Sequence, residues 1–256
     1  MSTVSAKSWD RYIKALRKLS DKARDEIEAK ILAVGTETPE AMQEIVRFGY
    51  AVATKYGEAT GALAAEMYDA LAELSGMSLA PAMQANTATY GDVAKAIYGT
   101  KLQSSNPSTI ANSIGRLVKM TGADTMLQNA MRDGAYYAWI PRGDTCAFCL
   151  TLASQGWQKI SAKSLKNGHA EHIHANCDCT YAIRFGDDLT VEGYDPDEYK
   201  AMYDEAEGRS SKDKINYMRR EFYQENKEEI NAQKRDAYEK RQELNGSAAE
   251  EINVGG

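Results

Sequence analysis

The strongest chemical signal in the sequence is a cluster of cysteines and histidines in its central region. The four cysteines of the chain form two close pairs, Cys146 with Cys149 and Cys177 with Cys179. The three histidines of the chain all lie between these pairs: His169, His172 and His174. Thiolate and imidazole groups are the ligands that zinc prefers in structural sites, so the cluster predicts metal binding.

The spacing suggests how such a metal site would be built. Two cysteines separated by two residues on a tight turn can both face one metal ion. The second pair follows the first after 27 residues, and the histidines offer substitute ligands. Spacing alone does not fix which four side chains bind. We favour a structural zinc ion held by Cys146, Cys149, His174 and Cys177, with Cys179 and His172 as alternative ligands.

The cluster also allows other interpretations. The cysteines could be small buried hydrophobic residues, disulfide partners or a redox pair, although a cytoplasmic origin argues against disulfides. The segment from His169 to Glu171 matches the H-x-E pattern of zinc nucleobase deaminases. In those enzymes a P-C-x-x-C segment comes later, whereas here C-x-x-C comes first and Thr145 precedes it. We therefore expect no enzymatic activity, neither that of a deaminase nor that of a metal-dependent nuclease.

Length and composition narrow the class of protein. The 256 residues are enough for one large domain or two small ones, and 27% charged with 43% hydrophobic residues is a normal globular balance that excludes a wholly disordered chain. The net charge of −6 argues against a surface that binds nucleic acid everywhere, but allows a local basic patch. With no long apolar run and no apolar N-terminal stretch, we expect no membrane span and synthesis in a cytoplasm.

Two long helices are expected before the cluster. Apolar residues recur at three- and four-residue steps from Trp9 to Ile31, and Gly35 ends that pattern. Thr38 is suited to cap a second helix that has Pro39 at its first position and runs to Ser75. At 1.5 Å per residue this second helix is about 55 Å long. Such a length favours an antiparallel helical arm over a compact enzyme core.

Shorter elements follow. We expect a short helix near Val93–Tyr98, a helix that continues through Ile110 to Val118 and breaks at Gly122, and a further helix that Gly134 ends. Residues 135–141 and 180–185 are rich in aromatic and apolar side chains and are predicted to be strands. Because these strands flank the cluster on both sides, their pairing would bring its two halves together.

The chain is thus predicted to be mainly α with a small α+β module: long N-terminal helices, a central Cys/His-rich knot flanked by short strands, and a C-terminal charged helix. Residues 201–245 carry 10 basic and 11 acidic side chains, which indicates an extended charged helix. We divide the chain into a helical region (1–104), a Cys/His module (105–190) and a charged helical extension with a flexible tail (191–256).

Several segments resemble the minor capsid, or head morphogenesis, proteins of tailed bacteriophages, in particular the MuF-related minor capsid proteins of actinobacterial phages. The most specific are the segment AWIPRGDTCAFCLTLAS that begins at Ala138 and the segment HANCDC that ends at Cys179. A helix with the pattern N-A-x-R-D precedes the first strand (Asn129–Asp133), and E-G-Y-D-P follows the cluster (Glu192–Pro196). The resemblance covers roughly residues 9–203.

The resemblance implies a structural role. Members of this family are few-copy components of the phage head that associate with the portal protein during assembly in the host cytoplasm and are carried inside the head with the DNA. The major capsid protein and a scaffolding protein are further candidate partners. An alternative is a zinc module that binds packaged or ejected DNA through basic residues near the knot: Lys159, Lys163 and Lys166.

Overall fold

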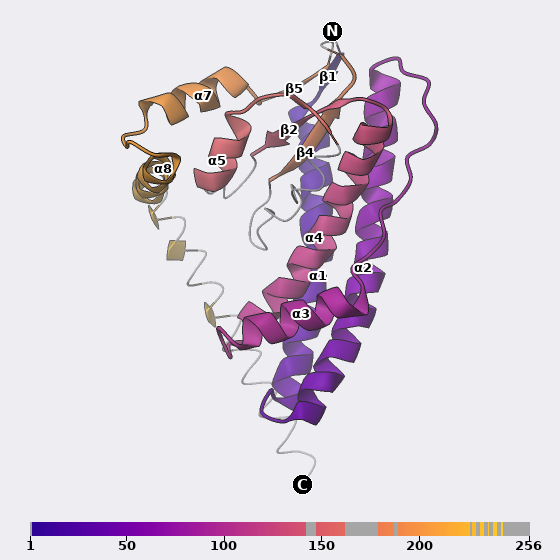
Figure 1. Cartoon of the computed structure of the whole chain (residues 1–256), viewed down its shortest axis with the longest axis vertical. Coiled ribbons are helices and arrows are strands. Elements are labelled where there is room, and N and C mark those ends of the chain that lie inside the picture. The colour runs from indigo at the N-terminus through magenta and orange to yellow at the C-terminus, as the bar shows by residue number, and fades with distance from the viewer. Residues whose placement is uncertain are drawn as a thin grey trace.

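The computed structural model describes residues 2–141, 147–161, 179–186 and 189–225, together with 227, 228, 231, 232, 235, 238, 239 and 242. Within these residues the chain is mainly helical and carries a small module of short strands, as predicted (Figure 1). The helices are α1 (Ala6–Val34), α2 (Pro39–Leu74), α3 (Tyr90–Lys101), α4 (Pro107–Arg132), α5 (Ala147–Ala153), α7 (Pro196–Glu205) and α8 (Ser211–Glu225). The strands are β1 (Ser2–Val4), β2 (Tyr136–Ile140), β3 (Gln158–Lys159), β4 (Thr180–Arg184) and β5 (Leu189–Val191). None of the described helices combines the length and apolar character needed to cross a membrane.

Local sequence signals set the ends of α1 and α2, and the end of α1 and both ends of α2 lie where they were predicted. The Ser5 hydroxyl accepts a hydrogen bond from the backbone of Ser8 and so caps α1, which ends at Gly35 with a φ of 72°. Thr38 caps α2 in the same way, and Pro39 occupies its first turn. The four-residue connection between the two helices makes them antiparallel neighbours.

The expected helical arm of α1 and α2 is covered by a third helix, α4, along its length, while α3 crosses the lower part of the bundle (Figure 1). The prediction that a helix ends at Gly122 is wrong, because α4 continues through this residue to Arg132. A Cβ atom at Gly122 would lie 2.8 Å from Cγ2 of Thr60 on α2. Gly122 therefore lets two helices approach closely. Glycine inside a helix is less favourable than alanine by only about 1 kcal/mol, so α4 continues through it.

The two predicted strands are present and pair with each other. β2 is the central strand of a three-stranded antiparallel sheet with the order β3-β2-β4. In its register with β4, Ile140 lies opposite Thr180 and Tyr136 lies opposite Arg184. The end of the strand that leads into the cluster thus lies beside the start of the strand that leaves it, as predicted. A separate parallel pair joins β1 to β5 near the N-terminus.

Two hydrophobic clusters lie along the bundle. The first joins the N-terminal turns of α1, the C-terminal half of α2 and the second half of α4 to both faces of the sheet. The second fills the other end of the bundle, between α1, α2, α3 and α4. Packing therefore runs across the proposed limit between residues 104 and 105. The three-region division itself stays a prediction from the sequence.

The C-terminal segment was predicted to be one extended charged helix over residues 201–245, and this prediction is wrong at its start. α7 ends at Glu205 and α8 begins at Ser211, and between them Gly208 adopts a φ of 142°, which is unfavourable for residues with a side chain. Ser210 then caps α8 by accepting a hydrogen bond from the backbone of Asp213. Ala206 and Met218 are buried against Leu150 of α5, so the start of the segment packs on the sheet module.

Candidate metal centre

The structure describes two of the six predicted ligand residues. Cys149 and Cys179 are both buried, with exposed fractions of 0% and 6%. The remaining four lie outside the described residues: Cys146, His172, His174 and Cys177. Within the described part of the chain, no group of three or more His, Cys, Asp or Glu side chains could hold a metal ion.

Cys149 is positioned by α5, which packs against the sheet. Its neighbour Leu150 points the other way, toward the contact with α8, so successive residues of this short helix serve two different cores. Burial raises the pKa of the Tyr181 hydroxyl on β4, and Cys149 contributes to that shift together with Tyr137 and Asp124. Cys149 and Tyr181 belong to the same hydrophobic cluster.

Cys179 is positioned by β4, which begins one residue later. It precedes Tyr181 by two residues, and side chains two apart in an extended strand share one face. Tyr181 is paired with Trp139 on β2, and their rings meet edge to face with centroids 4.6 Å apart. This aromatic pair lies one residue from the end of β2 and one from the start of β4, where the chain enters and leaves the Cys/His segment.

These two thiols belong to one hydrophobic cluster although 30 positions separate them in the sequence. One comes from the first cysteine pair and one from the second. The paired strands thus bring a member of each half of the Cys/His segment into the same core.

The N-A-x-R-D segment at the end of α4 fastens the long connection between α2 and α3, residues 77–89. The Asn129 side chain accepts a hydrogen bond from the Met83 amide (2.9 Å) and donates one to the Met83 carbonyl (2.7 Å). Thr125, one turn earlier, accepts from the amide of Ala85 at 3.0 Å. Asn129 and Thr125 are buried, so these contacts hold the connection against the helix. Neither of these two roles was predicted from the sequence.

Arg132 and Asp133 form an ion pair, with two contacts of 2.7 Å between the guanidinium and the carboxylate. The guanidinium also donates to the carbonyls of Ala80 (2.9 Å) and Pro81 (3.1 Å), and the Tyr68 hydroxyl donates to Asp133 (2.7 Å). The Arg132 hydrogen bonds, followed by that of Tyr68, hold the pKa of Asp133 below its usual value. The pair thus joins α2, α4 and the connection at one point.

The E-G-Y-D-P segment joins the sheet to the helices around it. The Glu192 carboxylate accepts a hydrogen bond from the amide of Ala6 at the start of α1 (2.8 Å). The Tyr194 hydroxyl donates to the carbonyl of Ala153 at the end of α5 (3.0 Å), and Asp195 caps α7. Each described polar side chain of the segment is therefore engaged in a contact that builds the fold.

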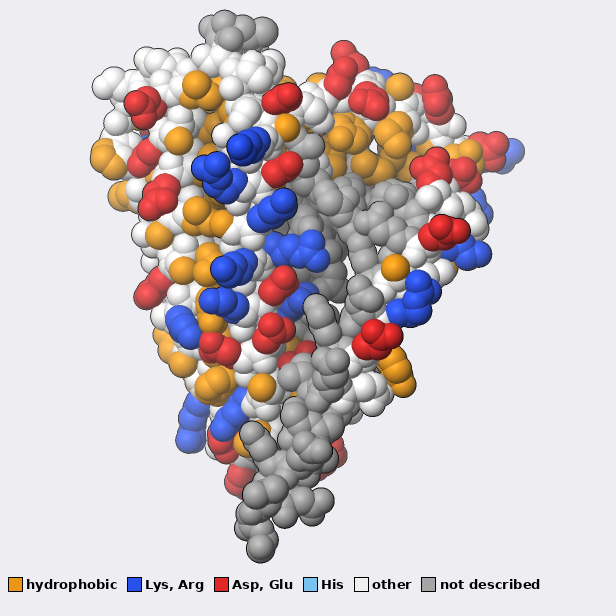
Figure 2. Space-filling view, turned by 180° about the vertical axis from the view of Figure 1, so that it is seen from behind, with side chains coloured by type: hydrophobic (Ala, Val, Ile, Leu, Met, Phe, Trp, Pro, Cys, Tyr) orange, Lys and Arg blue, Asp and Glu red, His pale blue; other side chains and the backbone are white. Residues whose placement is uncertain are grey.

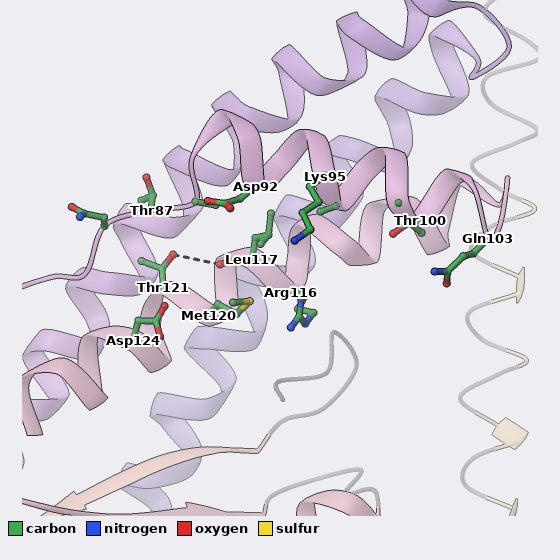
Figure 3. A pocket seen from close by; sticks show the side chains of 14 residues that line it. Thr87, Asp92, Lys95, Thr100, Gln103, Arg116, Leu117, Met120, Thr121 and Asp124 are labelled. Carbon is green, nitrogen blue, oxygen red and sulfur yellow. Dashed lines mark hydrogen bonds between the residues drawn. The ribbon is translucent and has the colours of Figure 1, made fainter. Parts of the chain in front are cut away.

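A polar pocket of about 530 Å³ lies elsewhere, between α3 and α4 (Figure 3). Lys95 points from α3 toward α4, which contributes Arg116 and Asp124 to the lining. None of the predicted metal ligands lines it. Asp92 lines the pocket too, but its carboxylate accepts from the hydroxyl and amide of Thr89 and is used to cap α3.

Fold and site together define a mainly helical protein in which a bundle supports a small sheet, and the sheet holds together the two ends of a cysteine- and histidine-rich segment. The chain belongs to the VG15 protein family, whose model matches residues 3–206. Membership identifies it as a viral protein of the phage type, which acts in a virion or its host cell. Comparisons with curated proteins and with solved structures returned no significant match.

Proposed function

We propose that this chain is a minor capsid, or head morphogenesis, protein of a tailed phage: a few-copy, non-enzymatic component that associates with the portal protein and is packaged inside the head. The major capsid protein and a scaffolding protein are its further candidate partners. The family match over residues 3–206 supports the phage context of this proposal.

One observation carries the structural, non-enzymatic part. The polar residues of the two best described motifs are used in contacts within the fold, where an enzyme would direct them into an open site. Asn129 and Arg132 hold the connection between α2 and α3, and Glu192 holds the start of α1. A protein whose distinctive residues fix the relative positions of its elements is suited to a role as a rigid part of an assembly.

The proposal includes a structural zinc ion held by Cys146, Cys149, His174 and Cys177, with Cys179 and His172 as the alternatives. Its support is the donor set, together with the burial of Cys149 and Cys179 in one cluster. Bound zinc would cross-link the two halves of the segment, and structural zinc contributes about 10–16 kcal/mol of apparent binding free energy.

The test is a phage that lacks this gene, complemented by variants supplied in the host. We expect the wild-type chain to restore infectious particles and to co-purify with the portal protein from infected cells. Cys146→Ser should fail in both assays, and Lys166→Ala, a change within the same segment, should behave as wild type. Normal particle yield without the gene, or no association with the portal protein, would contradict the proposed role.

The zinc can be tested separately by elemental analysis of protein purified under reducing conditions. About one zinc per chain is expected for the wild type, and Cys149→Ser should lose it. Folded wild-type protein without metal would remove the zinc from the proposal and leave the role in the head to be decided by the complementation assay.

A further inference from the structure

The first half of α1 carries a concentration of positive charge that the chain as a whole lacks. Residues 6–19 contain five basic side chains and one acidic one, a net charge of +4, whereas the whole chain has a net charge of −6. The charge is therefore local, and it lies on a single helix. Neither the candidate metal centre nor the proposed association with the portal protein accounts for it.

Four of these side chains form a straight line along the helix. Lys7, Arg11, Lys14 and Lys18 follow one another at steps of four, three and four residues, which places them on one face. All four are exposed, and the buried residues of α1, such as Trp9, occupy the opposite face. We call these four residues the basic stripe. At 1.5 Å per residue it is about 16 Å long.

The face of the molecule on which α1 lies carries many basic side chains. Figure 2 shows Lys and Arg side chains, with Asp and Glu among them, running down the face opposite to that of Figure 1. Among the described residues, none of the four stripe side chains is paired with a carboxylate. The fifth basic residue of this half, Arg17, does pair with a carboxylate, that of Asp21 at 3.6 Å, which Arg24 also contacts at 3.0 Å.

The chemistry of the stripe fits a nucleic acid backbone better than a protein partner. Protein interfaces are centred on aromatic and apolar anchors and are depleted in lysine. Beside the basic residues lie two small side chains, Ser8 and Ala15, and one carboxylate, Asp10, and the stripe has no aromatic or large apolar anchor. An evenly spaced row of lysine and arginine without apolar anchors is instead what neutralises successive phosphates of DNA.

We propose that the basic stripe of α1 binds the phosphate backbone of double-stranded DNA without sequence specificity. This goes beyond the proposed function, because it assigns a partner to residues that lie outside the Cys/His segment. It also differs from DNA binding through Lys159, Lys163 and Lys166. If the chain is carried inside the head, the DNA packed there is the duplex that the stripe would meet.

Fluorescence anisotropy with a labelled 24-base-pair duplex of mixed sequence tests the proposal on the full chain. If all four side chains contact phosphates, log K against log salt should have a slope of about −3.6, so affinity should fall about 150-fold between 50 and 200 mM NaCl. Lys14→Gln should reduce that fall to about 40-fold. Replacing all four stripe residues by Gln should abolish measurable binding.

A matched control removes the same number of charges from another exposed segment: Arg209→Gln, Lys212→Gln, Arg219→Gln and Arg220→Gln. We expect this variant to bind DNA like the wild type, and thermal unfolding by circular dichroism should show that both variants fold. No binding by the folded wild type, or equal loss in the two variants, would overturn the proposal. So would a stripe variant that keeps DNA binding but no longer co-purifies with the portal protein, since the stripe would then be a protein-docking surface. A wild type that binds DNA but fails complementation would refute the role in the head and leave this inference standing.

Discussion

Replacing Asn129 by alanine should loosen the connection between α2 and α3 without disturbing the bundle. The side chain is 2% exposed and makes two hydrogen bonds to the backbone of Met83 and a third to the carbonyl of Thr125. Asn129→Ala removes all three. The Thr125 carbonyl lies inside a helix, so the loss of the third bond should matter least.

The size of the effect follows from the two bonds to Met83. A typical hydrogen bond contributes about 1 kcal/mol net, and more when its loss leaves a buried partner unsatisfied. Both bonds are partly buried and Met83 is 69% exposed, so the freed backbone groups would be only partly shielded from water. We therefore expect Asn129→Ala to lower the free energy of unfolding by about 2–3 kcal/mol, which for a chain of this length is a fall of roughly 4–12 °C in Tm.

Urea denaturation followed by circular dichroism measures this change, and limited proteolysis should show earlier cleavage within residues 77–89. Asn86→Ala is the matched control, because Asn86 lies in the same connection but is exposed. Its effect should stay within about 0.5 kcal/mol. If both variants unfold alike and are cleaved alike, Asn129 does not hold the connection and the structural explanation of the N-A-x-R-D motif is wrong.

Three further substitutions test the packing described above. Gly122→Ala should lower the free energy of unfolding by about 1–3 kcal/mol through contact with the buried Thr60, an effect that the better helix propensity of alanine offsets by about 1 kcal/mol. Adding Thr60→Ser removes the contacting methyl group and should recover part of the loss. Additive effects in a double-mutant cycle would argue against the contact. The Arg132 contact lowers the folded-state pKa of Asp133, so this pair stabilises the fold above the unfolded-state pKa of about 4, and that stability is lost as the pH falls through the folded-state value. Asp133→Asn should therefore lose less stability than the wild type between pH 7 and pH 3 in urea titrations, and an identical loss would refute the assignment. Tyr194→Phe should lower the free energy of unfolding by about 1–2 kcal/mol, because it leaves the buried carbonyl of Ala153 without its hydrogen-bond donor. Thermal unfolding measures this change, and a value below about 0.3 kcal/mol would show that the bond contributes nothing.

The sequence predicted those parts of the fold that local signals determine. Gly35 and the Thr38-Pro39 cap placed the end of α1 and both ends of α2 within one residue, while α1 begins three residues before Trp9, the first apolar residue of its predicted pattern. The aromatic strands β2 and β4 were also correctly placed. In each case the residues that decide the structure lie within the element or directly beside it.

Where contacts distant in the sequence decide, local patterns were insufficient. A glycine that ends a helix and one that lets two helices approach look alike until the partner is known, and at Gly122 the partner is Thr60 on α2. β1 has no signal of its own, since Ser2–Val4 becomes a strand only by pairing with residues 189–191. The connection between α2 and α3 is likewise held by side chains that lie 40 or more residues away.

For the candidate site, too, the sequence predicted the neighbouring strands but did not settle the ligands. Their aromatic and apolar composition identified the two strands, which pair with each other, and Cys149 and Cys179 lie in the core formed around them. The choice among Cys146, His172, His174 and Cys177 depends on the path of residues outside the described part of the chain, so the ligand set stays a prediction.

The central claim is that this chain is a component of the phage head, and quantitative mass spectrometry of purified, DNA-filled particles tests it most directly. Peptides of this chain should be present at a few copies per particle, in proportion to the portal protein, and should remain with the head when tails are removed. Particles that are infectious yet contain none of its peptides, or peptides found only with tails, would contradict the account.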